Sequence, residues 1–169
     1  MRKPLVLVVM PLYNAVQYVQ KAVDSILNQT FKEFQLLIID DGSTDGSYEL
    51  VQGIKDPRVT VWKQENMGLC PTLNKGLRYA HENRIPYTAR MDADDLSEPT
   101  RLEKQLALLE ALPEKAACSS NCYYIDENDQ IIGSSTVPLS PRLIRWEVQQ
   151  GLRGMIHGAT LFRTEALFS

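Results

Sequence analysis

The stretch PYTARMDADDLSEPTRLEKQ, residues 86–105, joins an apolar segment to an amphipathic one through a dense group of acidic residues. The apolar segment, 86–92, is typical of a buried β-strand, and segment 98–113 has the apolar spacing of an α-helix. Ser97 precedes the amphipathic segment and is predicted to cap the helix. The stretch therefore predicts one strand–loop–helix unit with an acidic loop at the carboxyl end of its strand.

The same alternation of strand and helix precedes this stretch. Four such units in roughly 110 residues predict an α/β fold with a doubly wound, mostly parallel sheet and helices on both faces. Strands are predicted at 5–10, 34–40 and 58–64, and helices at 15–29, 43–54 and 69–83.

The last third of the chain has a different pattern. Residues 116–136 are typical of a strand, a polar turn near 127–129 and a return strand. Residues 140–151 predict a short helix, and 158–163 predict a further strand. We therefore expect a small β-hairpin region after the parallel sheet.

Composition excludes several classes of protein. The chain has 169 residues, a net charge of -3 and no basic block, which argues against a nucleic-acid surface. Three widely spaced cysteines, in an odd number, indicate reduced thiols in a cytosolic protein and not a disulfide framework. No apolar run approaches the roughly 18 residues of a membrane span.

Polar residues gather where the predicted strands end. The segments are PLYN at 11–14, DDGSTD at 40–45, ENMG at 65–68 and DADD at 92–95. The carboxyl ends of parallel strands meet at one edge, which is where open α/β sheets bind ligands. An edge with this many carboxylates needs a cation, and carboxylate oxygens suit Mg²⁺ or Mn²⁺.

Each segment also has a simpler interpretation as a turn, a helix cap or a solvated loop. A calcium loop starting at Asp92 fails because Leu96 and Ser97 occupy its fifth and sixth positions, and the sixth requires glycine. A phospho-acceptor domain would use the acidic pair at 40–41 but would not need a second acidic cluster at 92–95.

The segments VVMPLYN, LLIIDDGSTDGS, ENMGLCPTLNKGL and ARMDADDLSEPTRLEKQ together resemble the successive motifs of family-2 glycosyltransferases with the GT-A (Rossmann-like) fold. The resemblance is dense over 4–112 and looser up to 163. It implies one GT-A domain over 1–169, with 1–115 as the nucleotide-sugar-binding half and 116–169 as the start of the acceptor-side half.

By similarity to that family, the N-terminal motifs would bind the nucleotide. Asp41 would accept a hydrogen bond from the base, and Asp40 would support its loop. The remaining residues that the resemblance assigns to this part of the donor site are Pro11, Tyr13, Asn14, Asn74 and Lys75.

The acidic motif, which matches the family's Asp-X-Asp pattern, would hold the metal. Asp94 is the first choice of metal ligand and Asp95 the second, while Asp92 would contact the ribose. His157 is the third candidate metal ligand, although a lone histidine is more often structural. Arg90 and Arg101 flank this site.

The implied reaction is inverting transfer of a sugar from a nucleoside-diphosphate donor to a glycan or lipid-linked acceptor. UDP is the expected nucleotide, with GDP and dTDP as alternatives, and Mn²⁺ or Mg²⁺ would screen charge on the leaving diphosphate. No carboxylate in 116–169 matches the family's catalytic base, so the base is expected beyond Ser169 in a longer natural chain.

The resemblance is compatible with bacterial surface polysaccharide synthesis in the cytoplasm, with the full-length protein at the inner face of the membrane. Two alternatives stay open. One is a non-catalytic nucleotide-sugar-binding module, and the other is a receiver-like signalling domain phosphorylated at Asp40 or Asp41.

Overall fold

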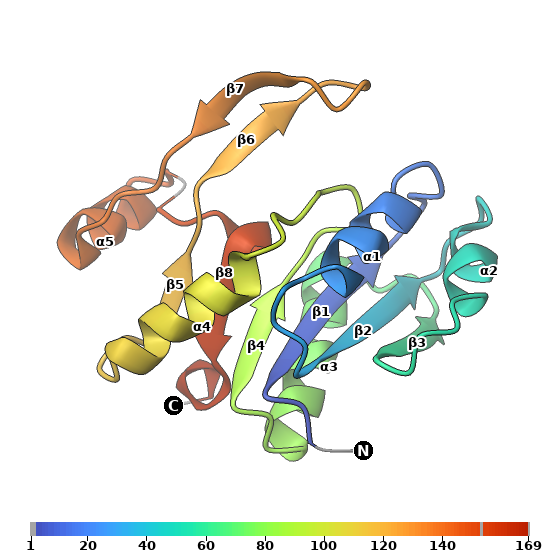
Figure 1. Cartoon of the computed structure of the whole chain (residues 1–169), viewed down its shortest axis with the longest axis horizontal. Coiled ribbons are helices and arrows are strands. Elements are labelled where there is room, and N and C mark those ends of the chain that lie inside the picture. The colour runs from blue at the N-terminus through green and yellow to red at the C-terminus, as the bar shows by residue number, and fades with distance from the viewer. Residues whose placement is uncertain (1–2, 153, 169) are drawn as a thin grey trace.

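A six-stranded sheet forms the centre of the computed structural model, which describes residues 3–152 and 154–168 (Figure 1). The strand order is β3-β2-β1-β4-β8-β5. The first four are parallel: β1 (Val6–Leu12), β2 (Phe34–Asp41), β3 (Val59–Gln64) and β4 (Tyr87–Arg90). β8 (Thr160–Arg163) is antiparallel to both β4 and β5 (Ala117–Ser119).

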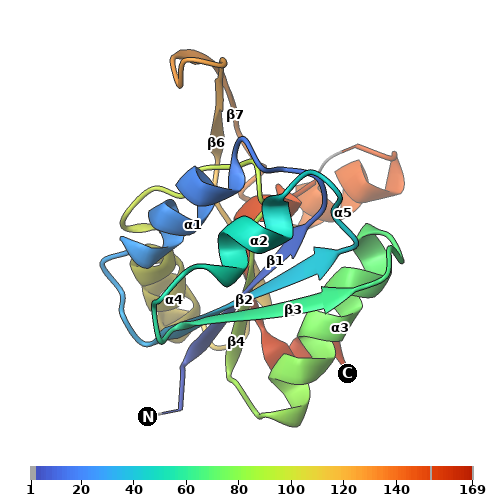
Figure 2. The ribbon, with the colours of Figure 1, turned by 90° about the vertical axis from the view of Figure 1, so that its right-hand side faces the viewer.

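Helices cover both faces of this sheet. α1 (Val19–Leu27), α2 (Ser47–Gln52) and α4 (Arg101–Ala111) bury their apolar side chains with one face, and α3 (Leu69–Glu82) lies against the other (Figure 2). The remaining helices are α5 (Pro141–Gln149) and two 3-10 turns, η1 (His157–Ala159) and η2 (Thr164–Leu167). The predicted α/β fold with helices on both faces is therefore confirmed.

The apolar run of β1 follows from this two-sided burial. Val8 contacts the α1 and α4 side, whereas Leu7 and Val9 contact the α3 side, so successive residues are all buried. On the α3 side a glycine is required: a Cβ on Gly76 would lie 2.5 Å from Cγ1 of Val9. The close approach of α3 to β1 fixes where the α3 N-terminus meets the carboxyl edge of the sheet.

The start of α4 differs from the prediction. Ser97 is not its N-cap, because the helix begins at Arg101 and Thr100 occupies the N-cap position. The Thr100 side chain makes no capping hydrogen bond. Instead, Oε1 of the buried Gln29 accepts a hydrogen bond from the Leu102 backbone N–H at 3.0 Å. A side chain from the end of α1 thus satisfies a free N–H of α4, which local sequence rules cannot reveal.

The C-terminal third contains one strand more than predicted. Residues 117–119 form β5, which joins the main sheet beside β8, and only then does the chain enter the hairpin of β6 (Cys122–Ile125) and β7 (Ile131–Ser135). The predicted turn, helix and final strand are confirmed. The cysteines are free, as expected, and burial raises the pKa of Cys118 to about 11. Within the described residues, no helix could cross a membrane.

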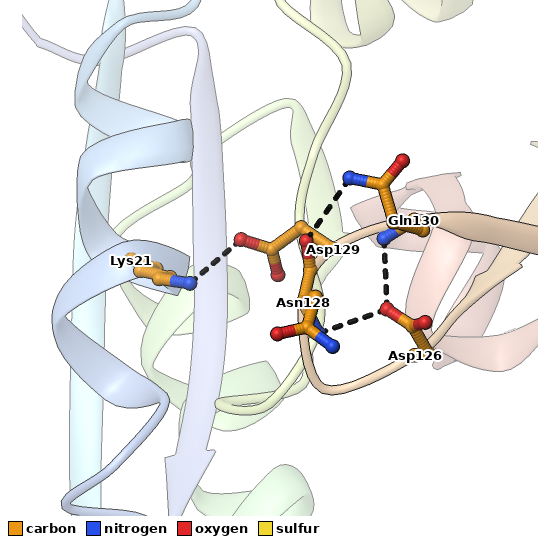
Figure 3. A network of polar contacts seen from close by, with 5 residues as sticks. All are labelled: Lys21, Asp126, Asn128, Asp129 and Gln130. Atoms are coloured by element: carbon orange, nitrogen blue, oxygen red, sulfur yellow. Dashed lines mark hydrogen bonds and ion pairs between the residues drawn. The ribbon is translucent and has the colours of Figure 1, made fainter.

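The hairpin projects from the sheet (Figure 1), and its tip contacts α1 (Figure 3). Oδ1 of Asp126 accepts hydrogen bonds from the backbone N–H groups of Asn128 and Gln130 at 2.8 and 3.0 Å, which fixes the turn. Asp129 has a φ of 61° and its Oδ2 lies 2.6 Å from Nζ of Lys21. This ion pair joins the hairpin tip to α1 across the carboxyl edge of the sheet.

Lys21→Ala is expected to loosen the hairpin without unfolding the domain. Both partners of the ion pair are exposed, and such pairs contribute only about 0.2–1 kcal/mol. We expect faster hydrogen exchange in residues 122–135 and nearly unchanged stability, measured by mass spectrometry and urea unfolding. Lys104→Ala, an exposed lysine of α4, is the matched control. Unchanged exchange in the hairpin would show that the contact does not restrain it.

Candidate functional site

The carboxyl ends of β1, β2 and β4 and the loop after β3 enclose a pocket of about 610 Å³. Its walls therefore come from all four segments that the sequence placed at strand ends. Six of the residues predicted for the site line it: Pro11, Tyr13, Asn14, Asp41, Asp92 and Asp94.

The loops after β1 and β2 are tied together along one wall. The Asn14 N–H donates to Oγ of Ser43 at 3.0 Å, and Oδ1 of Asn14 accepts from the Thr44 N–H at 2.9 Å. Asn14 has a φ of 49°, in the left-handed region that asparagine tolerates better than most residues. Asn14 therefore shapes this wall by holding two loops in place, whether or not it touches a ligand.

Asp41 lies at the base of the pocket and is held by the β3–α3 loop. Its Oδ1 accepts from Nε2 of Gln64 at 2.7 Å and from the Met67 N–H at 2.9 Å, and its Oδ2 accepts from the Gly68 N–H at 2.8 Å. Burial acts to raise the pKa of Asp41, but these hydrogen bonds outweigh it and lower the pKa below its usual value. The carboxylate is therefore charged near neutral pH.

Asp40 points away from the pocket and is fully buried. Its Oδ2 accepts a long hydrogen bond of 3.3 Å from the Ser43 N–H, and its Oδ1 has no hydrogen-bond partner in the described part of the chain. This position fits the expectation that Asp40 supports the loop. Gly42 next to it has a φ of 81° and approaches Asn66, so a side chain there would be strained and would clash.

Asn74 and Lys75 were expected to face the nucleotide, but neither lines the pocket. Asn74 is exposed on α3. Nζ of Lys75 donates to Oε1 of Gln64 at 2.9 Å and lies 5.5 Å from the centroid of the Trp62 ring. Lys75 is therefore linked to the pocket residue Asp41 indirectly, through hydrogen bonds of Gln64.

Opposite Asp41, the acidic loop brings three carboxylates together. Nη2 of Arg90 forms an ion pair with Oδ1 of Asp92 at 2.7 Å. Partial burial, followed by the charges of Asp92 and Asp94, raises the pKa of Asp95, and the charges of Arg101 and Arg90 oppose this shift. A Cβ on Gly158 would lie 2.7 Å from Oδ2 of Asp92, so a side chain there would displace the Asp92 carboxylate.

The buried Arg101 side chain makes hydrogen bonds on both sides of the acidic loop in the sequence, at Arg90 and Ser97. Its side chain is 8% exposed and donates to Oγ of Ser97 at 2.8 Å and to the carbonyl oxygens of Arg90 and Gly158 at 3.2 Å. Burial lowers the pKa of Arg101 to about 10, and the charge of Asp95 opposes that shift. The guanidinium therefore joins β4, the start of α4 and η1 behind the acidic loop.

His157 lies beside the acidic loop on the α3 side of the sheet. It borders a second cavity of about 150 Å³, together with Arg90, Phe162 and apolar side chains of α3. Burial and then the charge of Arg90 lower the pKa of His157, against the opposing effect of Asp92. Across residues 3–152 and 154–168, no three His, Cys, Asp or Glu side chains form a group that could hold a metal by themselves. Asp94, Asp95 and His157 are thus not assembled into a closed metal cage.

Comparison with known proteins decides the family. Residues 7–168 match the family model described as "Glycosyl transferase family 2". The chain belongs to this family.

Relatives of family 2 and solved structures agree with this assignment. Hyaluronan synthase of Pasteurella multocida is 37% identical over 120 residues, which make up 69% of this chain and 12% of that protein. TarS of S. aureus, solved with UDP-GlcNAc, has a TM-score of 0.70 and 20% identity and covers 96% of this chain and 46% of its own. The mannosyltransferase PcManGT of Pyrobaculum calidifontis, solved with GDP-Man and Mn²⁺, has a TM-score of 0.71 and 20% identity, covering 99% and 47%.

At 20% identity the two solved structures show the fold alone, and they confirm the predicted GT-A-like architecture. The chain spans less than half the length of each of these three proteins. The comparisons therefore give the family and the fold, and the structure supplies the geometry of the pocket.

The residues of this family-2 pocket fit a divalent cation that is shared with a ligand. Asp94 and Asp92 line the pocket, and Asp95 lies close enough for their charges to add to the effect of burial and raise its pKa, against the opposing charges of Arg101 and Arg90. Carboxylates are hard oxygen donors, and Mg²⁺ in nucleotide sites is commonly held by one or two of them plus substrate phosphates and water. A closed protein cage is therefore not needed here.

Several pocket residues were not singled out from the sequence. Tyr18, Asn66 and Thr72 also line the pocket, and Arg90, noted only as a flanking residue, forms part of its wall. Asn66 lies within the ENMG segment, so the strand-end rule pointed to its neighbourhood. Tyr18 and Thr72 sit among helical residues, and no local pattern distinguishes them from the apolar faces around them.

Proposed function

We propose that this chain is the donor-binding part of a glycosyltransferase that moves a sugar from a nucleoside-diphosphate donor to a glycan or lipid-linked hydroxyl. The observation that carries the proposal is one pocket lined by a hydrogen-bond acceptor, Asp41, at the end of β2 and by Asp92 and Asp94 after β4, on the other side of β1. A ligand that fills it must offer a donor group at one end and tolerate carboxylates at the other. A nucleotide with a metal-bound diphosphate meets both conditions.

In the proposed complex, the nucleobase lies against Asp41 and Tyr13, and Pro11 and Asn14 form the wall beside it. Tyr13 is 54% exposed at the pocket, so an aromatic ring is available for stacking on a base. Asp92 would accept from the ribose hydroxyls, and Arg90 fixes its carboxylate by the 2.7 Å ion pair.

Asp94 and Asp95 would hold Mn²⁺ or Mg²⁺ between the acidic loop and the diphosphate. When bound, the cation supplies a positive charge that stabilises the leaving diphosphate. Without it, the acidic loop would repel the ligand. Arg101 donates to the carbonyl oxygen of Arg90 at the end of β4, just before the acidic loop, and Gly158 leaves room for Asp92 and Asp95.

Inversion requires an acceptor hydroxyl to attack from the face opposite the diphosphate and to lose its proton to a carboxylate base. Two acidic residues of the hairpin are already engaged in other contacts. Asp126 accepts two backbone hydrogen bonds in the turn, and Asp129 is paired with Lys21. Neither Asp126 nor Asp129 is therefore proposed as the catalytic base.

The relationship to hyaluronan synthase supports a role in polysaccharide synthesis, because it is a family-2 relative whose name describes a polymer-forming enzyme. We propose UDP-sugars as donors, in the cytoplasm, with the full-length protein at the inner membrane face when its acceptor is lipid-linked. GDP- and dTDP-sugars are the alternatives that an experiment must include.

Calorimetric titration of UDP-GlcNAc, GDP-mannose and dTDP-glucose in Mn²⁺ buffer tests the proposal. At least one donor is expected to bind with a dissociation constant between about 1 μM and 1 mM, the usual range for enzyme substrates. ADP-glucose, whose base lacks a ring N–H donor, serves as the control and is expected to bind more weakly. Absence of binding by all three donors would contradict a donor site in this pocket.

A further inference from the structure

Gln64 lies at the end of β3, outside the pocket wall, and makes hydrogen bonds with all parts of its amide. Its Nε2 donates to Oδ1 of Asp41 at 2.7 Å and to Oγ1 of Thr72 at 2.8 Å. Its Oε1 accepts from Nζ of Lys75 at 2.9 Å. Three residues from β2 and α3 thus meet at one side chain.

Lys75 and Asp41 together determine which way this amide points. An ammonium group donates hydrogen bonds but accepts none, so the oxygen of the Gln64 amide must face Lys75. The opposite orientation would place the NH₂ group against the ammonium and the carbonyl oxygen against the Asp41 carboxylate. Lys75 is itself placed by the face of Trp62, 5.5 Å from its ring centroid.

The orientation of Gln64 in turn restricts Asp41. Together with the N–H groups of Met67 and Gly68, Gln64 occupies three acceptor positions of the carboxylate. A carboxylate has about four such positions, which leaves about one for a ligand. These hydrogen bonds also favour the charged form, so Asp41 can only accept.

A fixed, charged acceptor distinguishes between bases. Uracil, thymine and guanine carry a ring N–H that can donate to it. Cytosine N3 and adenine N1 carry a lone pair at the corresponding position, and a lone pair facing a carboxylate is repelled. The selectivity requires that Asp41 neither rotates nor takes up a proton.

We propose that Gln64 and Lys75 are positioning residues that hold Asp41 as a fixed ionised acceptor and thereby select donors whose base carries a ring N–H. This inference rests on the proposed donor site. It assigns Lys75 an indirect role through Gln64 in place of direct contact with the nucleotide.

The test compares UDP with CDP, which differ only in the pyrimidine ring, by calorimetry in Mn²⁺ buffer. Wild-type protein is expected to favour UDP by about 100-fold, the order of magnitude for leaving one buried hydrogen-bonding group unpaired. Gln64→Glu replaces the donor with a second carboxylate, and Lys75→Met releases the amide. Both are expected to reduce the UDP/CDP ratio to below about 10, mainly through weaker UDP binding.

Lys75→Arg keeps a donor toward Gln64 and is expected to restore most of the ratio. Lys63→Met removes the same charge from the neighbouring, exposed position of β3 and is expected to leave the ratio unchanged. A merely structural role would weaken UDP and CDP equally and leave the ratio at its wild-type value. Because Lys75 lies on the partly exposed side of α3, its substitution provides a second variant if Gln64→Glu does not fold.

Three results would overturn the inference. If Lys75→Met folds and its UDP/CDP affinity ratio is unchanged, Lys75 and the Gln64 amide do not control the selectivity. Equal binding of UDP and CDP to wild-type protein removes selection by Asp41 while leaving the donor site intact. Binding of none of the tested nucleotides would remove the proposed function and this inference together.

Discussion

Asp94→Asn is expected to abolish nucleotide-assisted binding of Mn²⁺ while leaving the domain folded. Asp94 lines the pocket in the acidic loop, and an amide in its place removes a negatively charged oxygen donor from the proposed metal site. Loss of a residue one step removed from a metal already costs roughly 10–100-fold in affinity, so loss of a ligand should cost about 100-fold or more. Electron paramagnetic resonance of free Mn²⁺, titrated with UDP present, measures this directly.

Asp24→Asn is the matched control for this substitution. Asp24 lies on α1, where it accepts a hydrogen bond from Gln20, and it does not line the pocket. It changes the net charge by the same amount, so a general electrostatic effect would appear in both variants. Mn²⁺ binding by Asp94→Asn that equals that of Asp24→Asn would show that Asp94 is not a ligand.

Arg101→Met is expected to destabilise the domain by about 3–5 kcal/mol, the cost of removing one partner from a buried charged network. Arg101 is 8% exposed, and its loss leaves the carbonyl oxygens of Arg90 and Gly158 without this donor and removes one of the two positive charges that act on Asp95. Chemical denaturation should show a lower midpoint with an unchanged slope.

Two further variants test whether the lost hydrogen bonds of Arg101 cause the expected loss of stability. Arg101→Lys keeps the charge but not the planar set of donors, so its stability should lie between those of wild type and Arg101→Met. Arg78→Met, at an exposed position of α3, should change the stability by less than about 0.5 kcal/mol. A midpoint for Arg101→Met close to that of Arg78→Met would contradict a supporting role for the buried arginine.

Strand periodicity and strand-end chemistry made much of the fold predictable. A strand buried on both faces is apolar throughout, as β1 is, and polar residues can follow it only where it leaves the sheet. Tyr13, Asp41 and Asp94 were identified in this way, and the topology brought them to one pocket because parallel strands share a carboxyl edge.

Long-range polar contacts were not predictable, because no local pattern encodes them. Gln29 takes the capping role expected of Ser97, although it lies 73 residues from its partner Leu102. β5 joins the sheet only because β8 returns beside β4. Gln64 and Lys75 reach Asp41 through hydrogen bonds between different elements, and a residue's type alone does not reveal such an indirect contact.

The central claim is that the acidic loop binds a divalent cation and that the cation in turn binds the donor diphosphate. Titration of UDP into the wild-type protein by calorimetry, once in Mn²⁺ and once in EDTA, tests it most directly. We expect binding in Mn²⁺ that is weakened by about 100-fold or more in EDTA, since the carboxylates would then face the diphosphate without a cation between them. Equal UDP affinity in the two buffers would contradict the claim and remove Asp92, Asp94 and Asp95 from a metal-binding role.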